Sequence, residues 1–297
     1  MDYNTSMKIF TLEPHSYCEG VTKAFLLARK AKKEHPDQRI YLLGSLVHNE
    51  DAVNELTKDG FILIDERKED LCSSLNAIPV GSIVIFSAHG HPEIYDEIAK
   101  NKQLIVYDAT CSKVKKNLDA IAYFVHAGRE VIFLGERLHL EAVAALSYGD
   151  KVHFLDAKRL SEFDFSLVKD KAPAFLTQTT MSEDDVREAG KMILSKIPAA
   201  FIMDGRCEST KKRQFNFYLA PKEADVIVVL GSITSNNTMK LVSIAKESHP
   251  DARVFRARNL EELQKFNLST YHYAILASGA STSPSVYNAC LEYLKNL

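Results

Sequence analysis

Short apolar runs alternate with longer segments of helical periodicity along most of the chain. The runs are rich in Ile, Val, Leu and Phe, which is typical of strands buried on both faces. They include residues 40–43, 83–86, 131–134, 226–229 and 274–276. In the segments between them, apolar residues recur with a period of 3.6, as in an amphipathic helix. One such face carries Ala24, Leu27, Ala28 and Ala31, and another carries Val114, Leu118, Ile121, Ala122 and Val125. This alternation predicts parallel α/β layers.

Three cysteines occupy the same place in three copies of this pattern. Cys18, Cys111 and Cys207 are separated by 93 and 96 residues, and each lies between a strand-like run and a predicted helix. A Leu-Gly pair follows each cysteine, with its glycine 26, 24 and 24 residues downstream. An internal repeat of this kind indicates three equivalent lobes. We therefore expect three loops around a pseudo-threefold axis.

Polar residues recur at two further positions of the repeat. The fourth residue after each glycine is His48, His139 or Ser235, and a later strand end in each copy carries His89, Thr179 or Ser281. Ligands of open α/β sheets bind at the carboxyl ends of the strands. The repeat thus predicts one polar pocket lined from all three lobes.

Composition excludes several classes of protein. The 297 residues include 37 Lys and Arg against 39 Asp and Glu, so the net charge of −2 suggests neither a nucleic-acid partner nor a membrane surface. No apolar run approaches the length of about 20 residues that spans a bilayer, and the first residues do not resemble a signal peptide. Five cysteines, an odd number, argue against a disulfide framework. We expect a cytoplasmic protein.

The three matched cysteines predict a metal site. Three thiolates without a CxxC pair suit an iron–sulfur cluster with one iron that lacks a cysteine ligand, or a zinc ion with an open position. Alternatively, the three cysteines are buried thiols that pack as small hydrophobic residues and bind no metal. We assign that role only to Cys72 and Cys290, which have no counterparts in the other copies.

Histidines, hydroxyls and amides at the matched strand ends predict an anion site. Such groups at helix N-termini bind phosphate well, and a diphosphate needs many donors. The predicted ligands are His48, His89, His139, Ser235, Asn236, Asn237 and Ser281. A zinc site built from the histidines is the alternative, although the same pocket already offers three thiolates.

Glu141 interrupts the repeat because no acid stands at its position in the other copies. A carboxyl group there could donate a proton to a leaving hydroxyl. It could equally be an acidic residue that complements a helix dipole. Thr179 could relay the proton or hydrogen-bond the ligand.

The motifs around these residues resemble the 4-hydroxy-3-methylbut-2-enyl diphosphate reductase family (IspH/LytB). The resemblance extends from about Lys8 to about Leu291. It is carried by residues 17–21 (YCEGV), 47–49 (VHN), 86–90 (FSAHG), 108–111 (DATC), 177–180 (TQTT) and 279–281 (GAS).

The resemblance implies a trefoil of three α/β domains around a 4Fe–4S cluster held by Cys18, Cys111 and Cys207. The expected lobes are 7–105, with 282–297 packing back on it, then 106–199 and 200–281. The seven predicted ligands would bind the diphosphate, and Glu141 and Thr179 would deliver protons. The implied reaction is the reductive dehydroxylation of an allylic alcohol to isopentenyl and dimethylallyl diphosphate, with electrons from a ferredoxin- or flavodoxin-type donor.

The chain departs from the family's usual sequence at three positions. Ser16, Leu140 and Asn236 stand where the family usually has Gly, Pro and Ser. A paralogue that acts on another alcohol or diphosphate with the same cluster is therefore an alternative. A zinc hydrolase or zinc-stabilised binding protein that uses the same cysteines is a second, and a metal-free phosphate- or sugar-binding module is a third.

Overall fold

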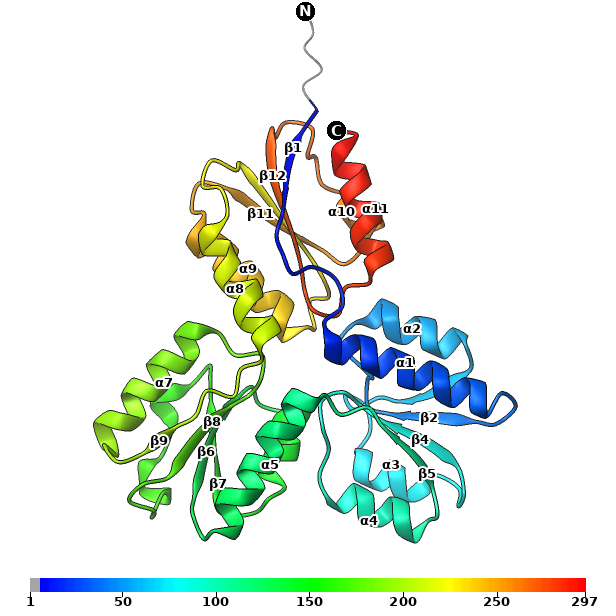
Figure 1. The fold of residues 1–297 in the computed structure, drawn as a ribbon, viewed down its shortest axis with the longest axis vertical. Helices are drawn as coiled ribbons and strands as arrows, with labels where there is room; N and C mark the ends of the chain where they lie inside the picture. Colours follow the sequence, from blue (N-terminus) through cyan, green and yellow to red (C-terminus); the bar gives the residue numbers. More distant parts are fainter. Residues whose placement is uncertain (1–5) are drawn as a thin grey trace, which may run out of the picture. The chain divides into compact units, whose positions relative to one another are not determined.

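Three parallel sheets with covering helices make up the structure, a computed structural model that describes residues 6–297 (Figure 1). Each sheet has four strands and every pairing within it is parallel. The predicted α/β class with small parallel sheets is confirmed. The inner strands β4, β6, β8 and β10 are buried throughout, which explains why their sequences are continuous apolar runs rather than alternating ones.

The first sheet has the strand order β3-β2-β4-β5. Its strands are β2 (Ile40–Leu43), β3 (Phe61–Ile64), β4 (Ile83–Phe86) and β5 (Ile105–Asp108). The helices of this part of the chain are α1 (Glu19–Glu34), α2 (Glu50–Lys58), α3 (Leu71–Ala77) and α4 (Ile94–Asn101).

The second sheet has the order β7-β6-β8-β9. Its strands are β6 (Val131–Gly135), β7 (Val152–Asp156), β8 (Ala174–Thr177) and β9 (Phe201–Ile202). The accompanying helices are α5 (Ser112–His126), α6 (Leu140–Leu146), the 3₁₀ turns η1 (Leu160–Glu162) and η2 (Phe165–Leu167), and α7 (Glu183–Lys196). Ser182 caps α7 in a reciprocal capping box with Asp185, as the acidic first turn of this helix suggests.

The third sheet has the order β1-β12-β10-β11. Its strands are β1 (Lys8–Thr11), β10 (Val226–Leu230), β11 (Arg253–Ala257) and β12 (Tyr273–Ser278). The helices are α8 (Glu208–Leu219), α9 (Asn236–Ser248), α10 (Leu260–Leu263) and α11 (Pro284–Lys295). Apolar cores pack on both faces of this sheet, one under α11 and the other under α8 and α9.

The chain divides into two compact units. One comprises Met1–Glu19, His48–Ala52 and Glu208–Leu297 and holds the third sheet. The other comprises Gly20–Val47 and Val53–Cys207 and holds the first two sheets.

The strand before each cysteine pairs in a different sheet from the one that the predicted lobe boundaries imply. The strand before each cysteine belongs to a different sheet from the elements that follow it: β1 pairs with β12, β5 with β4 and β9 with β8. Residues 8–11 therefore lie in the sheet of the third lobe rather than the first. The C-terminal helix α11 packs on that same sheet. Three lobes remain our proposed division, with these edge strands reassigned.

The three sheets nevertheless share one topology. In each sheet, one edge strand leads to a cysteine: β5, β9 and β1. Of the other three strands, the first in the chain (β2, β6 or β10) lies between the second (β3, β7 or β11) and the third (β4, β8 or β12), and the edge strand that leads to the cysteine pairs with the third. Each cysteine N–H then donates to the carbonyl of the second residue after the third strand. These bonds run from Cys18 to Ala280, from Cys111 to Ala88 and from Cys207 to Thr179, at 3.0, 3.0 and 3.1 Å. The predicted threefold repeat therefore extends to individual backbone hydrogen bonds.

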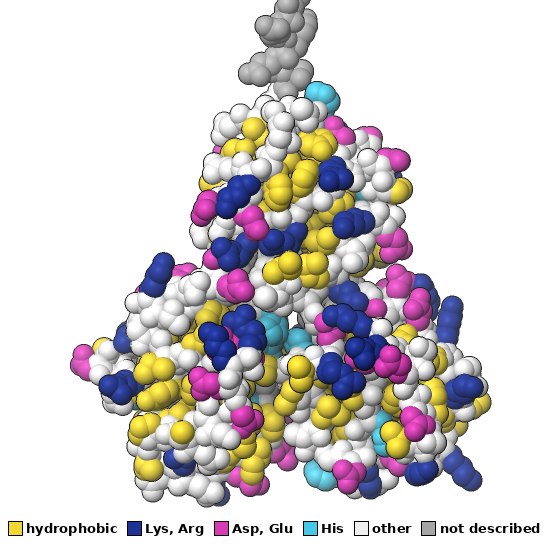
Figure 2. Space-filling model, turned by 180° about the vertical axis from the view of Figure 1, so that it is seen from behind, with side chains coloured by type: hydrophobic (Ala, Val, Ile, Leu, Met, Phe, Trp, Pro, Cys, Tyr) yellow, Lys and Arg dark blue, Asp and Glu magenta, His cyan; other side chains and the backbone are white. Residues whose placement is uncertain are grey.

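The outer surface is mixed in charge. On the face shown in Figure 2, basic, acidic and hydrophobic side chains are interspersed. Within residues 6–297, no helix combines the length and the apolar character that crossing a membrane requires.

Leu140 connects the second lobe to the core of the first. It is 9% exposed and packs in the cluster that contains Leu43, Leu71 and Phe86. A Cβ at Gly44 would lie only 3.2 Å from Leu140 Cδ1, and the φ of Gly44 is +78°. Glycine therefore suits this position both for its small size and for its positive φ.

We predict that Leu140→Ala lowers the free energy of unfolding by about 2–4 kcal/mol, because it leaves a cavity in the first lobe's core. Leu138→Ala is the matched control, since Leu138 is 85% exposed and should change stability by less than about 0.5 kcal/mol. Urea denaturation measures both. Equal losses for the two variants would contradict the packing assigned to Leu140.

Candidate active site

Glu141 is buried among hydrogen-bond donors. It lies in the first turn of α6, is 1% exposed, and accepts hydrogen bonds from the N–H and the hydroxyl of Thr179. The distances are 3.0 Å from Thr179 N to Oε1 and 2.8 Å from Thr179 Oγ1 to Oε2. The amide of Asn117 makes a longer contact of 3.5 Å to Oε1. The predicted pair of Glu141 and Thr179 is thus in direct contact.

Burial raises the pKa of Glu141 from 4.5 to about 7. The bonds from Thr179 and Asn117 oppose this shift, because they favour the charged carboxylate, but the loss of hydration outweighs them. At neutral pH the carboxyl is therefore close to half protonated. A group in this state can release a proton readily, as a general acid must.

His139 is oriented by the backbone next to Glu141. Its Nδ1 accepts from the N–H of Glu141 at 3.1 Å and caps α6. Nδ1 therefore carries no proton, so in the neutral ring the proton is on Nε2. Its ring lies edge-on to that of His89, with centroids 5.6 Å apart, and both side chains are partly buried. The two predicted ligands of this unit thus lie together.

The third repeat position differs by one residue from the prediction. Phe86, Thr177 and Ser278 are equivalent, because each pairs with the leucine before a repeat glycine. Thr179 is then equivalent to Ala88 and Ala280, and Thr180 is the equivalent of His89 and Ser281. The error arose because spacing was counted from the glycine, whereas strand pairing sets the true register. Thr180 Oγ1 accepts from Gln178 Nε2 at 2.8 Å, which leaves its own proton for another acceptor.

The unit that holds the third sheet brings together a second set of predicted ligands. Ser281 Oγ donates to the carbonyl of His48 at 3.1 Å, and Asn49 Nδ2 donates to the carbonyl of Ser281 at 2.6 Å. Asn49 also accepts from the N–H of Ala52. These bonds hold the His48 loop against the residues that follow β12. Asn49 was missed as a positioning residue, although it directly follows His48.

The N-terminus of α9 presents buried polar atoms. Ser235 caps the helix by accepting from Thr238 N, and Asn236 is its first residue. Asn237 is 5% exposed, and neither its amide nitrogen nor its amide oxygen has a hydrogen-bond partner within the described part of the chain. A buried amide in this state costs free energy unless a ligand or water satisfies it. The unpaired amide of Asn237 supports a ligand at this helix end that both accepts and donates hydrogen bonds, or a ligand that contacts the amide through a water molecule.

Arg213 fixes the loop that precedes Cys18. This guanidinium is 2% exposed and donates to the carbonyls of Pro14, Ser16 and Ser278 at 2.6, 2.7 and 2.8 Å. Ser16 N in turn donates to Ser278 Oγ at 2.7 Å. The sequence analysis missed Arg213, because its position in a helix gives no sign of the carbonyls that it binds.

Ser16 has a left-handed backbone, with φ of +59°. This conformation costs a residue with a side chain roughly 1–2 kcal/mol relative to glycine. The structure thus gives a physical reason why glycine suits this position.

None of the five cysteines forms a disulfide in the described structure. Cys18, Cys111 and Cys207 are partly buried in three equivalent loops. Cys290 is fully buried, and burial raises the pKa of its thiol to about 11, whereas Cys72 is partly buried beside the first lobe's core. Their predicted packing roles agree with these positions.

Within residues 6–297, no group of three or more His, Cys, Asp or Glu side chains is gathered closely enough to hold one metal ion. An iron–sulfur cluster instead takes its thiolates on separate iron atoms. Three thiols at one repeated backbone position, with no disulfide in the described structure, fit that donor set. Ligation by Cys18, Cys111 and Cys207 stays a prediction.

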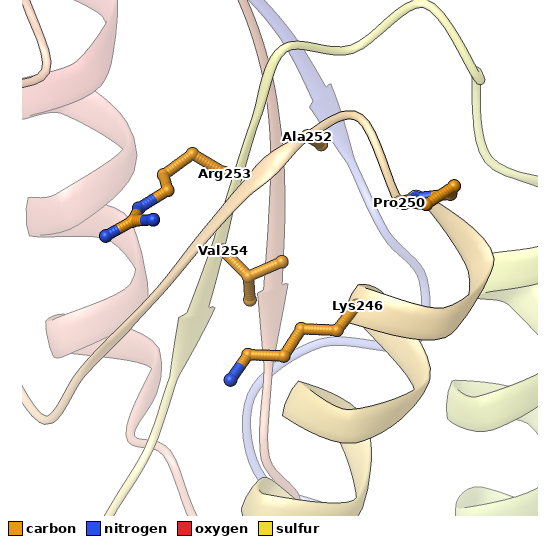
Figure 3. A pocket seen from close by; sticks show the side chains of 5 residues that line it. All are labelled: Lys246, Pro250, Ala252, Arg253 and Val254. Carbon is orange, nitrogen blue, oxygen red and sulfur yellow. The ribbon is translucent and has the colours of Figure 1, made fainter.

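A surface pocket on the third lobe contains none of the predicted residues. It is lined by Lys246, Pro250, Ala252, Arg253 and Val254 (Figure 3). The charged ends of Lys246 and Arg253 do not point toward one another in this view, so they do not form a joint anion site.

We predict that Ser16→Gly raises the free energy of unfolding by about 0.5–1 kcal/mol, because relief of the left-handed strain exceeds the extra backbone entropy of glycine. Ser147→Gly is the control. Its φ is −65°, so the same change there should destabilise the protein. Thermal or urea denaturation of both variants measures the difference, and destabilisation by Ser16→Gly would contradict the strain.

We predict a pH-dependent stability that comes from Glu141. Its folded pKa lies above the unfolded value, so its stabilising contribution is complete below pH 4.5 and is lost as the pH rises through about 7. Between pH 5 and pH 9 the wild type should lose on the order of 2–3 kcal/mol that Glu141→Gln does not lose. Urea denaturation across this range measures the difference. Parallel stability curves for the two proteins would rule out a raised pKa.

Comparisons with known proteins agree with this geometry. The family model described as LytB protein matches residues 9–295. The chain is 32% identical over 293 residues to 4-hydroxy-3-methylbut-2-enyl diphosphate reductase of Symbiobacterium thermophilum, covering 97% of both chains. It is 33% identical to the enzyme of the same name in Brevibacillus brevis, covering 97% of this chain and 92% of that one.

The structural comparison gives the same family. The structure of the E-1-hydroxy-2-methyl-but-2-enyl-4-diphosphate reductase from Plasmodium falciparum matches with a TM-score of 0.86 and 26% identity. The match covers 97% of this chain and 88% of that one. With a family match over nearly the whole length, the chain belongs to the LytB protein family.

Proposed function

We propose that this chain reductively dehydroxylates 4-hydroxy-3-methylbut-2-enyl diphosphate to isopentenyl and dimethylallyl diphosphate. Such a conversion consumes two electrons and two protons and releases one water molecule. The observation that carries the proposal is the buried pair of Glu141 and Thr179, with a carboxyl pKa of about 7, in a member of this family.

The cofactor in this proposal is a 4Fe–4S cluster held by Cys18, Cys111 and Cys207. When bound, it supplies electrons and, at an iron without a cysteine ligand, Lewis acidity. A ferredoxin- or flavodoxin-type protein is the proposed source of the electrons. Thiols in such a role suit a reducing compartment, so we propose the cytoplasm.

The diphosphate would be held mainly by neutral donors. His139 offers Nε2–H, because its Nδ1 is already an acceptor for the backbone. Ser235 accepts at the helix cap and keeps its hydroxyl proton, while the Asn237 amide has no protein partner in the described structure. Two more proposed ligands, His48 and His89, are partly buried. The hydroxyl of Ser281 already donates to His48 O and would have to rotate to bind an anion.

The proton path would run from Glu141 through Thr179. The hydroxyl of Thr179 lies 2.8 Å from Glu141 Oε2 and donates to it when the carboxyl is ionised. When Glu141 is protonated on Oε2, this hydrogen bond would reverse, so that Thr179 accepts the proton of the acid and passes its own hydroxyl proton to the leaving group. Burial of both side chains keeps water away from this step. Protonation of the leaving hydroxyl lets it depart as water.

The test is anaerobic isolation, followed by measurement of iron, sulfide and zinc and by reductant-driven turnover of the hydroxylated diphosphate. We expect about four iron and four sulfide per chain and formation of both products. Cys111→Ser should lose turnover, whereas Cys72→Ser, the matched control, should retain both cluster and turnover. Stoichiometric zinc without sulfide would overturn the redox mechanism. An intact cluster without turnover would indicate a different substrate.

A further inference from the structure

Asn117 is a polar residue on the apolar face of α5. Its buried neighbours on this helix are Val114, Leu118 and Ile121, and its own side chain is 4% exposed. An amide in such a place is costly unless its donors are satisfied. The acceptors that it contacts therefore indicate why the position is polar.

Three acceptors surround the Asn117 amide nitrogen. They are the carbonyls of Thr177 and Gly205, each at 3.0 Å, and Glu141 Oε1 at 3.5 Å. The nitrogen has two hydrogens, so the carbonyls take the shorter bonds and the carboxyl receives the longer contact. One side chain thus connects α5, the end of β8, the segment before Cys207 and the carboxyl of α6.

Gly205 shows that this connection is tight. A Cβ on Gly205 would lie 2.3 Å from Thr177 O and 2.7 Å from Asn117 Nδ2, so no side chain fits. Gly205 N also donates to Thr177 Oγ1 at 3.1 Å. Two residues later in each segment, Cys207 N donates to Thr179 O. The segment before Cys207 is therefore bound along its length to the strand end that carries Thr179.

We propose that Asn117 is a positioning residue that holds the Glu141 carboxyl and the Gly205–Cys207 segment in fixed relation to one another. Its amide donates toward both, and its helix begins directly after Cys111. The assignment rests on the proposed function for its catalytic meaning, but the geometry that it describes does not.

Asn117 would therefore affect the pH at which Glu141 loses its proton. The Asn117 donor favours the carboxylate, while burial favours the acid. Among residues 6–297, the groups that affect this pKa besides Asn117 are the hydroxyl and the backbone N–H of Thr179, and neither is charged. Without the amide, the carboxyl should hold its proton to higher pH.

The test compares Asn117→Leu and Asn117→Asp with the wild type in the cluster-loaded protein. The pH midpoint of the Glu141 carboxyl titration is measured by infrared difference spectroscopy. The carboxyl band is assigned as the one that Glu141→Gln removes. The pH profile of turnover is measured in parallel. We expect Asn117→Leu to shift both the midpoint and the descending limb upward, by less than about 1 pH unit because the contact is long. Asn117→Asp should shift the midpoint further, because two carboxyls then share one site.

Leu118→Ala is the matched control, since it weakens α5 at a buried apolar neighbour without touching the network. It should lower stability and leave the midpoint in place. An unchanged or lower midpoint in Asn117→Leu, or an equal shift in Leu118→Ala, would overturn the proposal. If the infrared midpoint shifts but no variant turns over the diphosphate, the positioning role stands and the proposed function fails.

Discussion

The proposed chemistry of this protein depends on a buried carboxyl whose charge is stabilised by hydrogen-bond donors. Within the described residues, the donors of Thr179 and a long contact from Asn117 stabilise the charge of Glu141, and burial outweighs them. The protonation of Glu141 is therefore set by the balance between burial and these hydrogen bonds. Displacement of Thr179 by a few tenths of an ångström would change that balance, so the surroundings of Thr179 must be rigid. The backbone supplies this rigidity.

Rigidity comes from a bond that the threefold repeat provides in every lobe. The N–H of each cysteine is held by the loop after the third strand, and in the second lobe the acceptor is Thr179 itself. The residue that bonds Glu141 is thus also the residue that anchors Cys207. A proposed proton relay, Thr179, and a proposed cluster ligand, Cys207, are thus joined by one backbone hydrogen bond. Gly205 and Asn117 fix the same segment from its other side.

Local patterns in the sequence were enough to predict most of the inner strands, the repeat and the pairing of Glu141 with Thr179, but they did not identify the edge strands β3, β7 and β11. The same patterns could not assign the edge strands β1, β5 and β9 to their sheets. Each of these strands is followed in the chain by elements of another lobe, so its sheet is known only from its hydrogen-bonded pairing. Counting from a glycine missed the register of Thr180 by one residue for the same reason. Asn117 did leave a signal, a polar residue between Val114 and Leu118 on an apolar face, but its partners lie far away in the sequence.

Leu140 stands where the resemblance led us to expect proline, and its packing shows how this chain holds the residue before Glu141. Proline at the first position of a helix fixes φ in advance and needs no neighbours. Leu140 has no such restriction, and the residue two positions earlier, Leu138, even has a φ of +66°. Instead, its side chain is buried in the first lobe's core against Leu71 and Gly44. The entry to α6 is therefore held by packing between lobes, and the orientation of the acid depends on contacts that the backbone of a proline would not require.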